Sequence, residues 1–198
     1  MSFYSTPSIA VLSCHPSTPC PDIHRITVQA GRKDGRLALK YRLEGDIDAL
    51  AIPPVAPPQR TDGLWQTTCF EVFITVLPQT DSVLKTEPAL DRGYYELNFS
   101  PSTAWAAYAF TRYRQGMAMA ELGEPVKIAV CRDVGWLELE SVVNLGGLGL
   151  PNEGTWHLGL SAVVQRESGD LSYWAYAHPQ GKPDFHHPDS FAFELEVD

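Results

Sequence analysis

Apolar and polar residues alternate along much of the chain, and a period of two is typical of β-strands rather than helices. Residues 37–43 place Leu, Leu, Tyr and Leu at every second position, with charged residues at most of the positions around them. Residues 24–30 and 136–143 show the same alternation, and polar turn sequences such as Gly31–Gly35 separate such runs. No window of ten or more residues carries a helical period with caps.

The pattern predicts about nine or ten short strands joined by turns. The run at residues 64–77 is the strongest, and it carries large apolar groups on both faces, so we expect a central strand. Residues 44–63 hold four prolines and predict a long loop that crosses between sheets. We expect polar loops at 78–92 and, with a short helical turn, at 144–154. The expected strands are residues 24–30, 37–43, 64–77, 94–100, 105–114, 126–132, 136–143, 156–165, 171–177 and 191–197.

Short strands at regular spacing predict an all-β fold, an antiparallel β-sandwich of the jelly-roll or immunoglobulin-like kind. The first 22 residues are rich in Ser, Pro and Thr, so we expect residues 1–22 to be an N-terminal surface segment. Residues 23–198 then form a single β-sandwich domain, which agrees with the length of 198 residues.

Composition narrows the classes of partner. Charged residues make up 20% of the chain and the formal net charge is −9, without a basic stripe, so nucleic acid and anionic membranes are not expected partners. No apolar run approaches the length of a transmembrane helix or the core of a signal peptide. We expect a cytoplasmic protein that binds a small molecule.

The four cysteines show no short spacing of the kind that binds zinc. Cys69 and Cys131 lie in strand-like runs and are expected to be buried thiols. Cys14 and Cys20 lie in the Pro-rich N-terminal stretch and could form a disulfide. A disulfide framework is not expected, and a reducing compartment suits this distribution best.

Three polar residues alternate onto the faces of predicted central strands: Glu71, Glu96 and Asn98. A buried carboxylate is costly unless it is paired or binds something. If the strands are neighbours, these side chains converge on one face and form a ligand pocket. The alternative is a structural ion pair between Glu71 and an arginine, for which Arg60, Arg112 and Arg114 are candidates.

Tryptophan and histidine supply the other candidates. Tryptophan rings stack on sugar rings and planar cofactors, and Trp65 and Trp105 lie at loop-to-strand junctions, although tryptophan also fills cores. The segment 178–189 is stiffened by prolines and is dense in His, Asp and Lys. It suits ligand contact or a structural His-Asp network, and its spacing matches no defined metal motif. The expected ligand-binding residues are Trp65, Glu71, Glu96, Asn98, Trp105, Arg112, His178, Lys182, Asp184 and His187.

Three motifs carry a resemblance to known proteins: Leu64-Trp-Gln-Thr-Thr-Cys-Phe-Glu-Val-Phe73, Tyr95-Glu-Leu-Asn-Phe-Ser-Pro-Ser102 and His178-Pro-Gln-Gly-Lys-Pro-Asp-Phe-His-His187. They resemble the bacterial DOMON-like proteins, which are in turn similar to family 9 carbohydrate-binding modules. The resemblance covers most of residues 65–193. It implies a β-sandwich with a ligand site on one sheet and its loops.

The resemblance implies two kinds of ligand. For sugars, the residues implied are Trp65, Glu71, Glu96, Asn98 and Trp105. For haem, it implies an axial Met with His or Lys, here Met117 or Met119 opposite His178 or Lys182.

The function that the sequence favours is non-catalytic binding of a carbohydrate or a similar polar metabolite. No nucleophile elbow, phosphate loop or dinucleotide fingerprint is present, so the chain is not expected to be an enzyme. The alternatives are a haem-binding DOMON-type protein, a hydrolase that acts on glycosides through a carboxylate pair, and a protein-interaction module. No cofactor other than haem is suggested.

Overall fold

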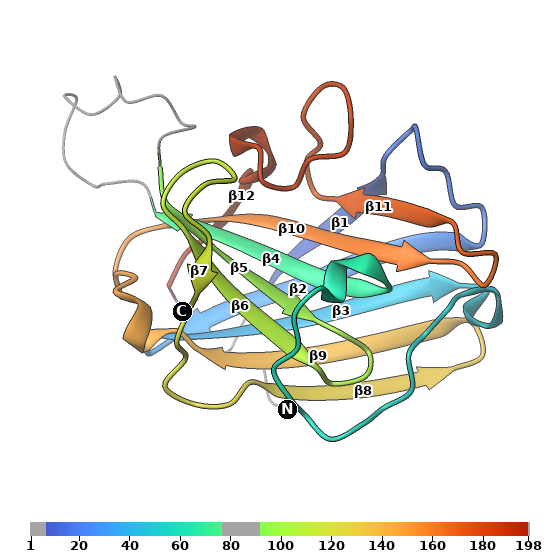
Figure 1. Ribbon diagram of the computed structural model, residues 1–198, viewed down its shortest axis with the longest axis horizontal. Coiled ribbons are helices and arrows are strands. Elements are labelled where there is room, and N and C mark those ends of the chain that lie inside the picture. Colours follow the sequence, from blue (N-terminus) through green and yellow to red (C-terminus); the bar gives the residue numbers. More distant parts are fainter. Residues whose placement is uncertain (1–6, 77–91, 198) are drawn as a thin grey trace.

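The computed structural model describes residues 7–76 and 92–197, and its regular structure is almost entirely β-sheet. Figure 1 shows the strands, with short 3-10 helices η1 (Ile47–Ala49), η2 (Leu64–Gln66), η5 (Gly146–Leu148) and η6 (Pro188–Ser190) between them. The strands of the described residues are β1 Ser8–Cys14, β2 Ile23–Lys33, β3 Arg36–Gly45, β4 Cys69–Val76, β5 Tyr94–Phe99, β6 Trp105–Phe110, β7 Ala118–Met119, β8 Lys127–Asp133, β9 Trp136–Asn144, β10 Trp156–Gln165, β11 Leu171–Ala175 and β12 Phe193–Leu195.

The described strands join in one antiparallel sheet, in the order β7-β6-β5-β4-β10-β11-β1-β2-β3-β9-β8, and β12 adds to β10. Strand β1 connects two halves, because residues 8–12 pair with β2 and residues 13–14 pair with β11. We call β4–β7 with β10–β12 the front half and β1–β3 with β8 and β9 the back half. The front half crosses over the back half in Figure 1.

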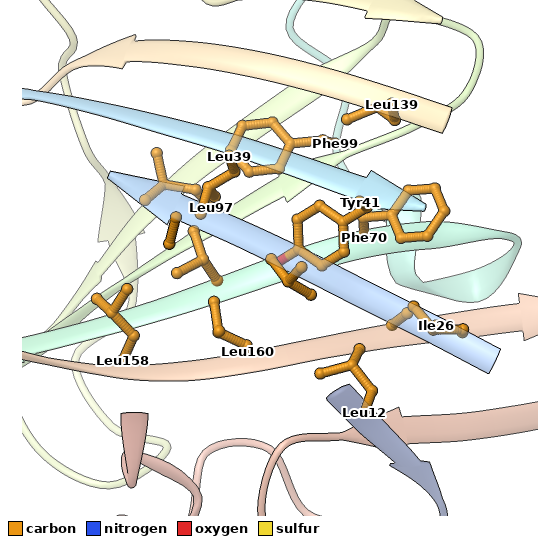
Figure 2. Close-up of a cluster of buried hydrophobic side chains, with 14 of the residues drawn as sticks. Leu12, Ile26, Leu39, Tyr41, Phe70, Leu97, Phe99, Leu139, Leu158 and Leu160 are labelled. Carbon is orange, nitrogen blue, oxygen red and sulfur yellow. The ribbon is translucent and has the colours of Figure 1, made fainter. Parts of the chain in front are cut away.

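The two halves pack their inner faces against each other over one apolar core (Figure 2). Phe70 and Leu97 of the front half and Leu39 of the back half are fully buried in it. The hydroxyl of Tyr41, from β3, donates a hydrogen bond of 2.7 Å to the backbone oxygen of Glu71 in β4. The predicted all-β, antiparallel fold is confirmed, and its class as a sandwich or jelly-roll stays a prediction.

The outer face of the front half is buried as well. Cys69 and Phe73 of β4 belong to a second apolar cluster that includes Tyr108 of β6 and Phe185 of the segment between β11 and β12. The ring of Phe73 lies 6.4 Å from that of Phe185. Gly159 lets this segment approach the sheet, since a Cβ there would lie 3.3 Å from the backbone oxygen of Ser190. Both faces of β4 are therefore covered.

Most predicted strands are confirmed within a few residues, and the ends that differ are informative. The strand expected to begin at Leu64 begins at Cys69, because Gly63 adopts a left-handed φ of 76° and starts η2. The strand expected to reach Arg114 ends at Phe110, since Arg114 is left-handed with φ 54°. The final strand is shorter than expected, and η5 lies in the segment expected to hold a helical turn. The loop expected at 78–92 falls almost wholly outside the described residues.

The N-terminal segment and one cysteine differ from expectation. Residues 8–14 form β1, and Ala10 and Leu12 are buried in the core, so the expected surface segment contributes a strand. The predicted boundary at residue 22 stays a prediction. Cys131 is exposed rather than buried, because β8 is the edge strand of the back half. Cys69 is buried as expected.

Cys14 and Cys20 are free thiols, so the disulfide considered for them is not formed. None of the helices in the described part of the chain is long and apolar enough to cross a membrane.

We expect Tyr41→Phe to destabilise the fold by about 1 kcal/mol, because it removes one buried hydrogen bond and leaves the apolar packing in place. Chemical denaturation followed by tryptophan fluorescence measures the loss. Tyr176→Phe is the matched control, since Tyr176 is 41% exposed. Equal stability of the two variants would show that the bond between the halves contributes nothing.

Candidate ligand-binding site

A row of buried polar side chains crosses the outer face of the front half. Glu71 of β4 lies directly opposite Asn98 of β5 on one side and Ser161 of β10 on the other. Glu96 of β5 lies opposite Phe73, one step along the same face. The exposed fractions of Ser161, Glu71, Asn98 and Glu96 are 1%, 2%, 0% and 5%. Directly opposed residues have Cβ atoms about 5 Å apart, so these groups are close neighbours.

The carboxyl group of Glu71 has no protein partner among the described residues, and its Oε1 atom is buried without a hydrogen bond. Burial, followed by the charge of Glu96, raises the pKa of Glu71 well above its ordinary range. The ion pair considered for Glu71 is not formed. Arg60 donates to backbone oxygens of residues 107 and 120 instead, and Arg114 pairs with Asp184.

Glu96 is held by a neighbour on its own strand. The side-chain amide of Asn98 donates to Glu96 Oε1 at 2.8 Å, which leaves Asn98 Oδ1 buried without a partner. Burial raises the pKa of Glu96 to about 7, against the lowering effects of this hydrogen bond and of the charge on Arg114. Near neutral pH the site therefore holds a carboxyl pair that readily retains a proton.

His186 completes the polar wall beside Glu96. The backbone N–H of Arg114 donates to the Tyr94 hydroxyl at 3.2 Å, and that hydroxyl lies 2.7 Å from His186 Nδ1. When the Tyr94 hydroxyl donates to Nδ1, the ring proton of the neutral imidazole is on Nε2. His186 Nε2 lies 3.8 Å from Glu96 Oε2, too far for a hydrogen bond. Burial lowers the pKa of His186 to about 4, so the contact is not an ion pair at neutral pH.

Asp184 joins the two loops that carry this wall. It accepts hydrogen bonds from the hydroxyl of Tyr113, from the guanidinium of Arg114 at 2.7 Å and from the backbone N–H of His186 at 3.1 Å. Burial alone would raise the pKa of Asp184, but the bonds from Tyr113 and Arg114 outweigh it and lower the pKa below its ordinary value. Asp184 is thus the ionised anchor that fixes Arg114 and His186.

These residues surround an open pocket of about 460 Å³. Its walls are largely aromatic, and the carboxyl groups contact it from the sheet. Trp65 stands at one side, 38% exposed, with its ring edge-to-face with Tyr108 at 5.9 Å. The residues that line the pocket are Trp65, Glu71, Phe73, Glu96, Phe110, Arg114, Met117, Val163, Tyr173, Pro183, Phe185 and His186.

The structure brings five of the expected site residues to this region. Trp65, Glu71 and Glu96 line the pocket. Asn98 lies behind them and holds Glu96, and Asp184 holds the loops at the rim.

The other five expected residues lie elsewhere. Trp105 faces the opposite side of β6, against the main core, and the Arg60 guanidinium lies 5.5 Å from its ring centre. Arg112 and Lys182 are exposed and do not line the pocket. The remaining two residues are histidines whose rings contact backbone atoms. His178 Nε2 is 2.8 Å from the backbone oxygen of Ser13. His187 Nδ1 accepts a hydrogen bond from the backbone N–H of Asp189 in η6.

Arg114 and His186 are pocket residues that the sequence did not single out as ligand contacts. His186 stands in the polar segment that the sequence marked, but nothing in the pattern separates it from His187. The side chain of Arg114 reaches the pocket because the chain turns after β6, and the alternating pattern does not reveal the direction of that turn. Phe73 and Phe110 could have been identified as pocket residues from the sequence. In the alternating pattern Phe73 shares a face with Glu71, and Phe110 shares a face with Tyr108.

The residues considered for haem do not form an axial pair around this pocket. Met117 lines it and Met119 lies exposed in β7. Neither His178 nor Lys182 is among the described residues that line it. Haem binding therefore stays a prediction of the sequence resemblance alone.

Comparison with solved structures gives a likeness over nearly the whole chain. A Bacteroides uniformis protein, provisionally assigned as carbohydrate-binding, covers 97% of this chain and 87% of its own, with 13% identity and a TM-score of 0.60. A family 9 carbohydrate-binding module from Caldicellulosiruptor kristjanssonii in complex with cellotriose covers 97% of this chain and 82% of its own, at 12% identity and TM-score 0.49. The same module with glucose covers 98% and 84%, at 12% identity and TM-score 0.47.

No protein-family model and no curated protein matches the chain. The likeness to the Bacteroides uniformis protein shows a common fold. The neighbours found include family 9 carbohydrate-binding modules, the class that the sequence resembles. The DOMON-like part of the resemblance stays a prediction.

The raised pKa of Glu96 makes a prediction for Glu96→Gln. Between about pH 4.5 and 7 the folded protein keeps a proton on Glu96 that the unfolded chain has released. Wild-type stability therefore falls relative to the variant as pH rises through this window, by on the order of 3 kcal/mol in total. His186 titrates with the opposite sign in both proteins. Because the charge of Glu96 also raises the pKa of Glu71, the difference reports the titration of the carboxyl pair.

Urea denaturation of both proteins at pH 5, 6, 7 and 8 measures that difference. We expect it to grow up to about pH 7 and then to level off. A difference that is constant over the series would mean that Glu96 has an ordinary pKa and is not buried as described.

Proposed function

We propose that this chain binds a carbohydrate or a similar polar small molecule in the pocket between Trp65 and His186. The observation that carries the proposal is the carboxyl group of Glu71, which is 2% exposed, contacts an open pocket and has no partner in the part of the chain that the structure describes. An unpaired buried polar group costs free energy, on the order of 1 to 3 kcal/mol. A ligand that donates to it offsets this cost, and a purely structural role leaves it unexplained.

The walls suit a sugar ring. Trp65, Tyr173 and Phe110 offer flat apolar surfaces that pack on sugar C–H groups, while Glu96 and the His186 Nε2–H offer an acceptor and a donor for hydroxyl groups. The common fold with a protein provisionally assigned as carbohydrate-binding supports the same ligand class. We also propose that the chain has the sandwich architecture of family 9 carbohydrate-binding modules, which the sequence resemblance implies.

We expect Trp65→Ala to weaken sugar binding by about tenfold or more, because it removes an exposed ring that packs on the ligand. Titration calorimetry against glucose, cellotriose and a panel of simple sugars identifies a ligand and then measures the loss. Trp136→Ala is the matched control. Trp136 is a partly exposed tryptophan on the outer face of the back half, beneath Arg42.

Two outcomes would count against this proposal. One is that no sugar of the panel binds the wild-type protein. The other is that Trp65→Ala and Trp136→Ala weaken binding equally, which would place the ligand away from the pocket.

One observation favours a second function, hydrolysis of a glycosidic bond. Glu71 and Glu96 contact one pocket, and burial, followed by the charge of Glu96, raises the pKa of Glu71. A protonated acid beside an ionised carboxylate is the pair that glycosidases use.

Release of nitrophenol from a set of aryl glycosides tests this second function. Turnover by the wild type that is lost in both Glu71→Gln and Glu96→Gln would establish hydrolysis. Sugar binding without release of nitrophenol would leave the chain a binding protein.

A further inference from the structure

The acceptors at the base of the pocket outnumber the donors. Glu71 Oε1 and Asn98 Oδ1 are buried acceptor atoms without hydrogen bonds, and they belong to side chains that face each other across β4 and β5. One of the two side-chain N–H donors of Asn98 is already used on Glu96. The hydroxyl of Ser161, on the other side of Glu71, also has no partner. A ligand group that reaches Glu71 therefore meets lone pairs and the one proton that the Glu71–Glu96 pair retains.

The charges in the pocket also favour a ligand group that donates hydrogen bonds. Glu71 and Glu96 give the pocket two carboxyl groups. The cation at its rim, Arg114, is neutralised by Asp184 at 2.7 Å. His186 is uncharged at neutral pH because burial lowers its pKa to about 4. The Glu71–Glu96 pair retains a proton near neutral pH, because burial and the charge of Glu96 raise the pKa of Glu71. An ammonium group of a ligand can take the place of that proton, which passes to the solvent, and it then faces two carboxylates.

The aromatic walls add to this preference. Five aromatic side chains surround the carboxyl groups, and their ring faces carry partial negative charge that attracts cations. Such a lining beside a carboxylate is the surrounding in which proteins hold ammonium groups. The aromatic side chains of the pocket are Trp65, Phe73, Phe110, Tyr173 and Phe185.

We propose that the pocket selects a ligand with an ammonium group, an amino sugar in chemical class, whose –NH₃⁺ binds at Glu71. This inference rests on the proposed function and narrows it to cationic sugars. An ammonium group has three donors and no acceptor, so it can satisfy Glu71 without bringing lone pairs to the site. A sugar hydroxyl brings two lone pairs for each proton, and an acetamido group has one donor and no charge.

The test compares sugars that differ in one substituent. Glucose, galactose and mannose are titrated at pH 7 beside their 2-amino and 2-acetamido counterparts by calorimetry. For the hexose that fits the pocket, we expect the amino form to bind at least about fivefold more tightly than the other two forms, because a hydrogen bond to a charged group is stronger by about 1 kcal/mol. This comparison needs only the wild-type protein.

Variants then assign the preference to the site. Glu71→Gln keeps the shape of the side chain and is expected to reduce the amino-sugar preference to less than about twofold. Glu194→Gln, on an exposed position of β12, is the matched control and is expected to leave the preference unchanged. Thermal unfolding, and binding of the neutral sugar where it is measurable, confirm that each variant is folded.

The outcomes separate this proposal from the one on which it rests. Neutral sugars that bind as tightly as amino sugars would overturn the ammonium site and leave carbohydrate binding in place. No binding of any sugar would overturn both. A separate titration with CaCl₂ covers inorganic cations: Ca²⁺ binding that Glu71→Gln abolishes would assign the carboxyl groups to a metal ion and overturn the ammonium site.

Discussion

Strand β4 is covered on both faces, and the two faces place opposite demands on its side chains. The inner face packs into the core between the sheet halves with Phe70, Val72 and Ile74, all fully buried. The outer face is enclosed by the segment between β11 and β12, yet it carries Glu71. Glu71 Oε1 is buried without a hydrogen bond among the described residues, so the fold holds an unpaired polar atom at the base of an open pocket.

Two loops far apart in the sequence make that pocket, and Asp184 ties them together. The turn after β6 brings Arg114 and Tyr113 to the rim, and the segment after β11 brings His186. The proline-rich composition of the latter segment reduces its freedom in the unfolded chain, which lowers the entropic cost of holding His186 beside Glu96. The site is thus built on a rigid sheet floor with loops fixed by one ionised side chain.

Much of the fold could be predicted from alternation, because side chains on successive strand residues point to opposite faces. The same rule placed Glu71, Glu96 and Asn98 on one face once their strands were assumed to be neighbours. Trp105 was selected by a different rule, its place at a loop-to-strand junction, and that rule does not reveal which face of the sheet a side chain occupies. Arg114 could not be predicted either, because its direction depends on a left-handed turn rather than on a strand.

The central claim is that Glu71 is a ligand-binding group and not a structural one. A crystal structure of the protein with its tightest-binding sugar tests this most directly. We predict that a nitrogen or oxygen donor of the ligand lies within hydrogen-bond distance of the Glu71 carboxyl group, with Trp65 against the ring. A ligand bound elsewhere, with Glu71 paired to an arginine or to a neighbouring side chain, would contradict the account.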